Sequence, residues 1–161
     1  MSYWIFDGFN LLRTVPPLAA WEKSRGVAFA QEQLEQKLKA FLQQEGKGSH
    51  GLLCWDGVRS DAGTAMRAGI LQIRHARPPE SADDLILQEV KRGIGNRKVT
   101  VVTSDGALRG KLAGLKARLL TSPQFFHQYL RLDAGGRVQV EKPEKLTIDE
   151  QAEWLRRFEG K

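Results

Sequence analysis

Apolar residues follow two patterns along the chain, short unbroken runs and longer stretches with helical spacing. The short runs predict buried strands at residues 3–6, 51–55, 70–75, 99–103 and 117–120. Residues 99–103 are the clearest case, because every one of them is β-branched. Helical spacing predicts helices at about residues 28–44 and 82–94, a short helix after residue 105, and a helix opened by Ser122-Pro123 with Ser122 as its N-cap.

The order of these elements is strand, helix, strand, repeated up to about residue 130. Such an order favours parallel strands joined by crossover helices. We therefore expect a three-layer, doubly wound α/β fold with a mostly parallel sheet. Residues 1–130 would form the main domain.

The tail, residues 131–161, has a different pattern. Ala134-Gly135-Gly136 lies between two alternating segments and predicts a hairpin. Residues 147–158 predict a final helix, with Thr147 and Glu150 as a capping box. We expect this hairpin and docking helix to be an appendage of the same globule.

Composition narrows the class of protein. The chain has 161 residues, the size of one ordinary domain, and contains no apolar run long enough to cross a membrane. Its first residues lead into a strand and do not resemble a signal peptide. Cys54, its single cysteine, supplies neither an internal disulfide nor a zinc cluster, so we expect a cytoplasmic protein. Nothing in the sequence indicates the oligomeric state.

The net charge of +6 is unevenly distributed. Residues 1–130 carry 18 Lys and Arg against 12 Asp and Glu, whereas residues 131–161 carry seven of each. A basic body suits a polyanion such as RNA. The other interpretation is that the charge serves only solubility.

Acidic residues stand where three predicted strands end. Asp7, Asp56 and Asp105 each follow a strand and precede a glycine, and Asp83-Asp84 begins a helix. The carboxyl ends of parallel strands share one edge of a sheet with the starts of the following helices. We therefore expect these carboxylates to converge, although Asp-Gly after a strand is also a common turn and Asp56 alone fits that interpretation.

Converging carboxylates repel one another unless a cation offsets their charge, and Mg²⁺ or Mn²⁺ is the natural partner of carboxylate oxygens. A site of this kind suits metal-assisted phosphodiester hydrolysis, with one or two metals. Asp83 and Asp84 point about 100° apart on a helix, so we expect only one of them to be a direct ligand. Asp84 is the choice, with Asp83 close by.

Three segments resemble the YacP-like family, in the NYN branch of the PIN-like ribonucleases. They are Asp7-Gly8-Phe9-Asn10, residues 81–86 and residues 101–105, and the similarity covers about residues 2–130. The resemblance implies a flavodoxin-like PIN fold and Mg²⁺- or Mn²⁺-dependent endonucleolytic cleavage of RNA. By position, Asp7, Asp84 and Asp105 would bind metal, Asn10 would position a ligand or phosphate, and Ser104 would form a hydrogen bond. Asp56 stays a possible neighbour, because its segment is only loosely similar.

The substrate would be single-stranded RNA, either messenger or ribosome-associated, with the ribosome as a candidate partner. Basic residues near the motifs are candidates for holding its phosphates, or else form a solvated face: Arg13, Arg59, Arg77, Arg109 and Lys111.

Other functions stay open. A non-catalytic RNA-binding module on the same fold is the main alternative. A phosphatase of the haloacid dehalogenase type would need a second Asp where Phe9 stands. A receiver-like signalling domain would need a late lysine, which the segment Thr121-Ser122-Pro123 does not provide.

Overall fold

The computed structural model describes residues 2–46, 48–57, 69–93, 95, 97–132 and 138–139. Five of its strands form one parallel sheet in the order β3-β2-β1-β4-β5. Their bounds are Ser2–Asp7 for β1, Ser49–Asp56 for β2, Leu71–Ala76 for β3, Lys98–Val102 for β4 and Arg118–Leu120 for β5.

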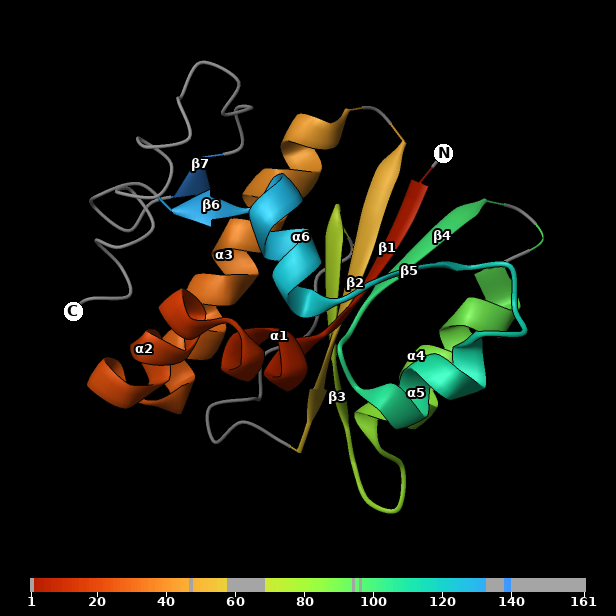
Figure 1. Ribbon diagram of the computed structural model, residues 1–161, viewed down its shortest axis with the longest axis horizontal. Coiled ribbons are helices and arrows are strands. Elements are labelled where there is room, and N and C mark those ends of the chain that lie inside the picture. Colours follow the sequence, from red (N-terminus) through yellow and green to blue (C-terminus); the bar gives the residue numbers. More distant parts are fainter. Residues whose placement is uncertain are drawn as a thin grey trace.

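Helices cover both faces of this sheet (Figure 1). One face carries α1 (Gly8–Thr14), α2 (Pro16–Arg25), α3 (Val27–Glu45) and α6 (Ser122–Tyr129). The other carries α4 (Ala82–Gly93) and α5 (Gly106–Leu112). The predicted three-layer, doubly wound α/β architecture is confirmed.

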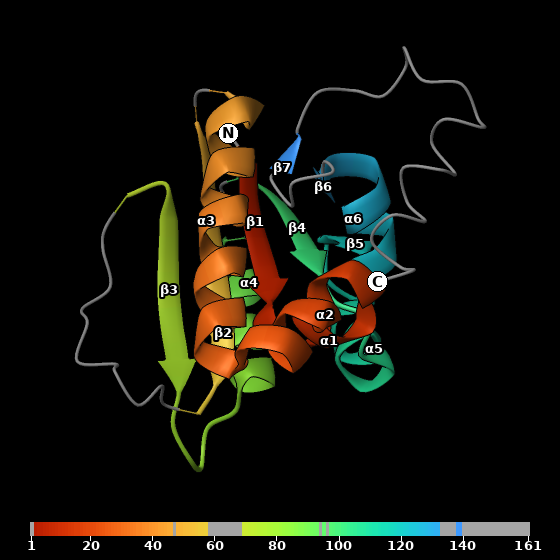
Figure 2. The same cartoon turned by 90° about the vertical axis from the view of Figure 1, so that its left-hand side faces the viewer.

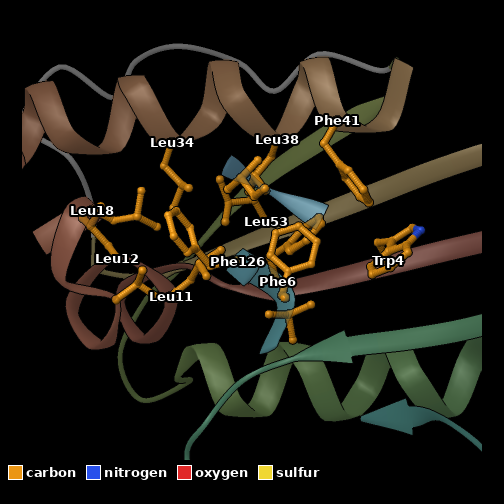
Figure 3. Packing of buried hydrophobic residues seen from close by; sticks show 14 of the residues in the cluster. Trp4, Phe6, Leu11, Leu12, Leu18, Leu34, Leu38, Phe41, Leu53 and Phe126 are labelled. Atoms are coloured by element: carbon orange, nitrogen blue, oxygen red, sulfur yellow. The ribbon is translucent and has the colours of Figure 1, made fainter. Parts of the chain in front are cut away.

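Alternation along β1 explains why both faces are covered. Trp4 and Phe6 pack with the α1, α2, α3 and α6 side, whereas Tyr3 and Ile5 pack with the α4 and α5 side. Figure 3 shows the first of these layers, in which Leu34, Leu38 and Phe41 of α3 lie over the sheet. A strand that buries both faces reads as a continuous apolar run, as residues 3–6 do.

The sequence pattern missed two helices, α1 and α2. They bury only Leu11, Leu12 and Leu18 among their large apolar side chains, too few to show a helical period. α1 begins directly after β1 at Gly8, where an added Cβ would lie 2.8 Å from the carbonyl oxygen of Cys54. Only glycine fits this approach, so the Asp7-Gly8 pair has a packing cause.

The N-cap of α6 differs from the prediction. Thr121, not Ser122, caps the helix: its side chain accepts from the N–H of Gln124, and the Gln124 side chain accepts from the N–H of Thr121. Ser122 is left with a different role at the site described below.

In the tail, β6 (Arg131–Leu132) and β7 (Val138–Gln139) pair in antiparallel fashion. The expected helix at 147–158 lies outside the described residues. Within the part that is described, no helix has the length and apolar character needed to cross a membrane.

The direction of winding reverses between β1 and β4. The chain runs outward from β1 to β2 and β3, and then returns to β4 on the other side of β1. In open parallel sheets, ligands bind at the carboxyl ends of the strands at this reversal point. A ligand site is therefore expected at the residues that follow β1 and β4.

Candidate active site at the carboxyl ends of β1 and β4

Asp7 and Thr103 meet at the reversal point. Asp7 ends β1 and is 6% exposed, and Thr103 follows β4 and is fully buried. The Thr103 hydroxyl donates to Asp7 Oδ2 at 2.8 Å and accepts from the backbone N–H of Asp105 at 3.1 Å. One buried hydroxyl therefore links two of the predicted acidic residues.

Asp105 is the N-cap of α5. Its Oδ1 accepts from the N–H groups of Ala107 at 2.9 Å and Leu108 at 3.2 Å. These bonds fix the carboxylate at the carboxyl edge of the sheet, where the strand-end argument predicted it. The second carboxylate oxygen accepts no hydrogen bond from any described residue.

The adjacent residues Asp83 and Asp84 have different surroundings. Asp84 is exposed and forms a capping box with Ser81: its Oδ2 accepts from the Ser81 N–H, and Ser81 Oγ accepts from the Asp84 N–H. Asp83 is half-buried, and burial, followed by the nearby charges of Asp105 and Asp56, raises its pKa. The structure thus groups Asp83, and not Asp84, with Asp7 and Asp105.

Asp56 also belongs to this group of carboxylates. Its Oδ1 accepts from the N–H of Ala82 at 2.7 Å, which ties the end of β2 to the start of α4. Its charge is one of the causes that raise the pKa of both Asp7 and Asp83. The charge of Asp56 therefore acts on Asp7 and Asp83, and Asp56 is not an isolated turn residue.

The four carboxylates Asp7, Asp56, Asp83 and Asp105 form what we call the acidic edge. Burial raises the pKa of Asp7 to about 6, and Asp83, Asp105 and Asp56 add to the rise while the Thr103 hydrogen bond opposes it. Burial is also the main cause of the raised pKa of Asp83, which Lys111 opposes.

The acidic edge fits a divalent cation by its chemistry. In the described ranges no Lys or Arg forms an ion pair with any of its members. Three of its carboxylates, those of Asp7, Asp56 and Asp105, nonetheless accept hydrogen bonds from the protein, and no three acidic, histidine or cysteine side chains of the described part could together hold one ion as they stand. Ligation would therefore draw the carboxylates together against their present hydrogen bonds.

Asn10 frames the site. Its Oδ1 accepts from the Ser104 N–H at 2.7 Å and from Ser122 Oγ at 2.8 Å, and Ser104 Oγ accepts from the Ser122 N–H at 2.9 Å. These bonds join α1, the loop after β4 and the start of α6. The hydrogen-bonding role expected for Ser104 is present, whereas the Asn10 carbonyl oxygen is already used within the protein.

The predicted RNA-binding residues have different surroundings. Arg13 forms two hydrogen bonds with Glu22 and lies over the Phe9 ring, and Arg109 donates to the Thr103 carbonyl at 3.1 Å. Arg77 and Lys111 are exposed. Arg59 lies outside the described residues. Arg77 and Lys111 form no side-chain hydrogen bond or ion pair with another described residue, whereas Arg13 and Arg109 each have donors occupied within the protein.

Sequence reasoning missed Thr103 and Ser122 as members of the site. Thr103 precedes Ser104, which had been selected, and Ser122 had been assigned only as a helix cap, but nothing in the apolar pattern shows that their hydroxyls contact Asp7 and Asn10.

Thr103→Val is expected to raise the pKa of Asp7 further, because it removes the hydrogen bond that lowers it. If Asp7 must be ionised for cleavage, the acidic limb of the pH–rate profile shifts to higher pH and the rate falls by roughly 10- to 100-fold. Thr103→Ser keeps the hydroxyl and serves as the control. If Thr103→Val leaves the pH–rate profile as unchanged as Thr103→Ser does, this role of Thr103 is contradicted.

Comparison with known proteins identifies similar chains. A family model described as the YacP-like NYN domain matches residues 4–157. The crystal structure of Rae1 (YacP) from Bacillus subtilis matches with a TM-score of 0.64 and 18% identity, over 79% of this chain and 72% of that one. A mutant form of Rae1 matches with a TM-score of 0.62 and 21% identity, over 79% and 74%. At these identities the structures support the fold. No curated protein gives a significant match.

Proposed function

Because the chain belongs to the YacP-like NYN domain family, we propose that it is an endoribonuclease that hydrolyses phosphodiester bonds of single-stranded RNA with Mg²⁺ or Mn²⁺. The family itself indicates a nuclease-like, RNA-related function. The observation that carries the finer proposal is the burial of Asp7 beside three further carboxylates that form no ion pair with a cation among the described residues. Such an arrangement is costly unless a cation binds there.

Asp7, Asp83 and Asp105 are the residues proposed to hold the ion, with Asp56 beside them. When bound, a divalent ion would activate water and offset charge on the phosphate. Thr103 would hold the Asp7 carboxylate, and the bonds of Asn10 would hold the loop that carries Asp105. Lys111 and Arg77 would meet the RNA backbone.

Asp83→Asn and Asp84→Asn form a matched pair, because the change is the same at adjacent residues. Asp83→Asn is expected to reduce Mn²⁺-dependent cleavage by about 100-fold, comparable with the loss of a catalytic group. Asp84→Asn should reduce it less than about threefold, since that carboxylate caps α4. Single-turnover cleavage rates measure both. The reverse ranking would restore Asp84 as the ligand.

The proposed function is tested by incubating the purified protein with labelled single-stranded RNA, with Mn²⁺, with Mg²⁺ and with EDTA. We expect internal cleavage products with either metal and none in EDTA. Cleavage that persists in EDTA would refute the metal requirement. Tight binding without cleavage would favour the alternative, a non-catalytic RNA-binding module on the same fold. The ribosome as the setting for cleavage remains a proposal from the family resemblance.

A further inference from the structure

A second polar feature lies at the opposite end of the sheet. It is a cavity of about 240 Å³ on the α4 face, lined in part by Tyr3, Gln72, Arg74, Glu89, Arg92 and Arg97. We call it the arginine cavity. Tyr3 lies four residues before Asp7 in β1, about 13 Å away at about 3.3 Å per strand residue, whereas the backbone of Arg74 is level with Asp7, two strands away.

One carboxylate lies at the centre of the cavity. Glu89 accepts from the Tyr3 hydroxyl at 3.2 Å, from Arg92 Nη1 at 2.8 Å and from Arg74 Nη1 at 3.4 Å. Arg97 stacks over the Tyr3 ring, with Cζ 3.9 Å from the centroid. Two guanidinium groups therefore contact the Glu89 carboxylate and a third, that of Arg97, lines the same cavity, so the three arginines exceed the one carboxylate by two positive charges.

These guanidinium groups retain unused donors. Each carries five N–H donors, and the bonds to Glu89 use one from Arg74 and one from Arg92. The Glu89 side chain is only 10% exposed, whereas those of Arg74 and Arg92 are 39% and 74% exposed. The donors thus face solvent while the neutralising carboxylate is buried, a distribution that suits a phosphate group.

Helix polarity explains only part of this cluster. Arg92 is in the last turn of α4, where cations interact favourably with the helix dipole. Arg74 comes from β3, and Arg97 precedes β4. The three arginines meet at one cavity only through the tertiary fold, because the helix dipole does not account for Arg74 or Arg97.

The edge strand β3 connects the cavity with the acidic edge. Gln72 and Arg74 pair in register with Leu52 and Cys54, which belong to the α4-side core, so both project toward the α4 face. Arg77, exposed, follows the carboxyl end of β3. β3 is an edge strand of the sheet, as Figure 2 shows, and no other strand among the described residues pairs with its outer side.

We propose that the arginine cavity binds a backbone phosphate of the same RNA strand that is cut at the acidic edge, some nucleotides away from the scissile bond. The proposal rests on the proposed function for the identity of the ligand. Its chemistry, a phosphate held by guanidinium donors, is shared with a free nucleotide or inorganic phosphate. The test therefore separates these sources.

The test measures binding of fluorescein-labelled single-stranded RNA in EDTA, so that cleavage plays no part. The variant Arg74→Gln/Arg97→Gln keeps Arg92 as the partner of Glu89, which avoids an unpaired buried charge. We expect the dissociation constant to rise by roughly 5- to 20-fold and the salt slope to fall by about 1. Arg25→Gln is the control, because Arg25 also stacks on a ring, that of Phe29. Arg97→Gln alone, which touches no bond of Glu89, serves if the double variant fails to fold.

Unchanged RNA affinity in both cavity variants would overturn the proposal, whether or not the protein cleaves RNA. It would also fall if the variants lost affinity for tripolyphosphate or inorganic phosphate, measured by calorimetry, while keeping that for RNA. With Mn²⁺, a raised KM for RNA and an unchanged kcat would support it. If the wild-type protein binds RNA through the cavity but never cleaves, the nuclease proposal fails and the cavity proposal stands.

Discussion

Asp7→Asn is expected to reduce metal-dependent RNA cleavage by about 100-fold or more, since even the partners of metal ligands are commonly worth 10- to 100-fold. Asp7 lies at the reversal point of the sheet, buried, with three further carboxylates close enough to raise its pKa. An amide has almost the same shape but no charge to offer a cation. Its oxygen can still accept from the Thr103 hydroxyl, so the fold should be preserved.

Single-turnover cleavage of labelled RNA at saturating Mn²⁺ measures this effect, and circular dichroism checks the fold. Asp84→Asn is the control, because it makes the same change in a carboxylate that caps α4. Arg13→Gln is a second control, since Arg13 is occupied by Glu22. Asp7→Asn with wild-type rates, or cleavage lost equally in all three variants, would contradict the role assigned to Asp7.

The acids at strand ends could be predicted from the sequence because one rule places them. Residues that end parallel strands share an edge, so Asp7 and Asp105 needed only a correct strand assignment. The same rule brought Asp56 to this edge, although the turn interpretation had weakened its case. Burial on both faces made these strands easy to recognise, as for residues 3–6 and 99–103.

The choice between Asp83 and Asp84 could not be made from the sequence. It depends on the rotation of α4 about its axis, which is set by the packing of Leu85, Ile86 and Val90 against the sheet. Ser81 then forms a capping box with Asp84, whereas Asp83 is close enough to Asp105 for that charge to raise the pKa of Asp83. The spacing of Ser81 and Asp84 is itself typical of a capping box, in which the side chain at the third helical position accepts a hydrogen bond from the backbone N–H of the N-cap residue.

Basic residues were harder to assign for a related reason. Their long side chains take whichever partner is near, so Arg13 pairs with Glu22 and Arg109 with the Thr103 carbonyl. The arginine cavity was missed entirely, since Arg74, Arg92 and Arg97 are apart in sequence and meet only when β3, α4 and the start of β4 are assembled.

In the metal-free protein, Asp7→Asn is expected to increase the free energy of unfolding at neutral pH. The pKa of Asp7 is about 6 in the folded protein against an ordinary value of 3.8, because burial and neighbouring acids disfavour its charge. The folded state therefore holds this proton more tightly than the unfolded state. The wild type gains stability from it below about pH 4 and loses that contribution as the pH rises through about 6. A shift of two pKa units corresponds to about 3 kcal/mol in the free energy of unfolding. Asparagine does not ionise, so the variant would not lose this contribution as the pH rises.

Urea unfolding in EDTA, across pH 4 to 8, tests the sign as well as the size. The two proteins should be about equal near pH 4, and the variant should be more stable by about 1–3 kcal/mol near pH 7 to 8. Adding Mn²⁺ at about 1,000 times its dissociation constant should reverse the ranking, because an ion that binds only the folded wild type stabilises it by about 4.1 kcal/mol at that concentration. Asp84→Asn should show neither the gain nor the reversal. A variant less stable than the wild type at pH 8 in EDTA would mean that Asp7 is held by favourable interactions, and the reason for expecting a cation at the acidic edge would be lost.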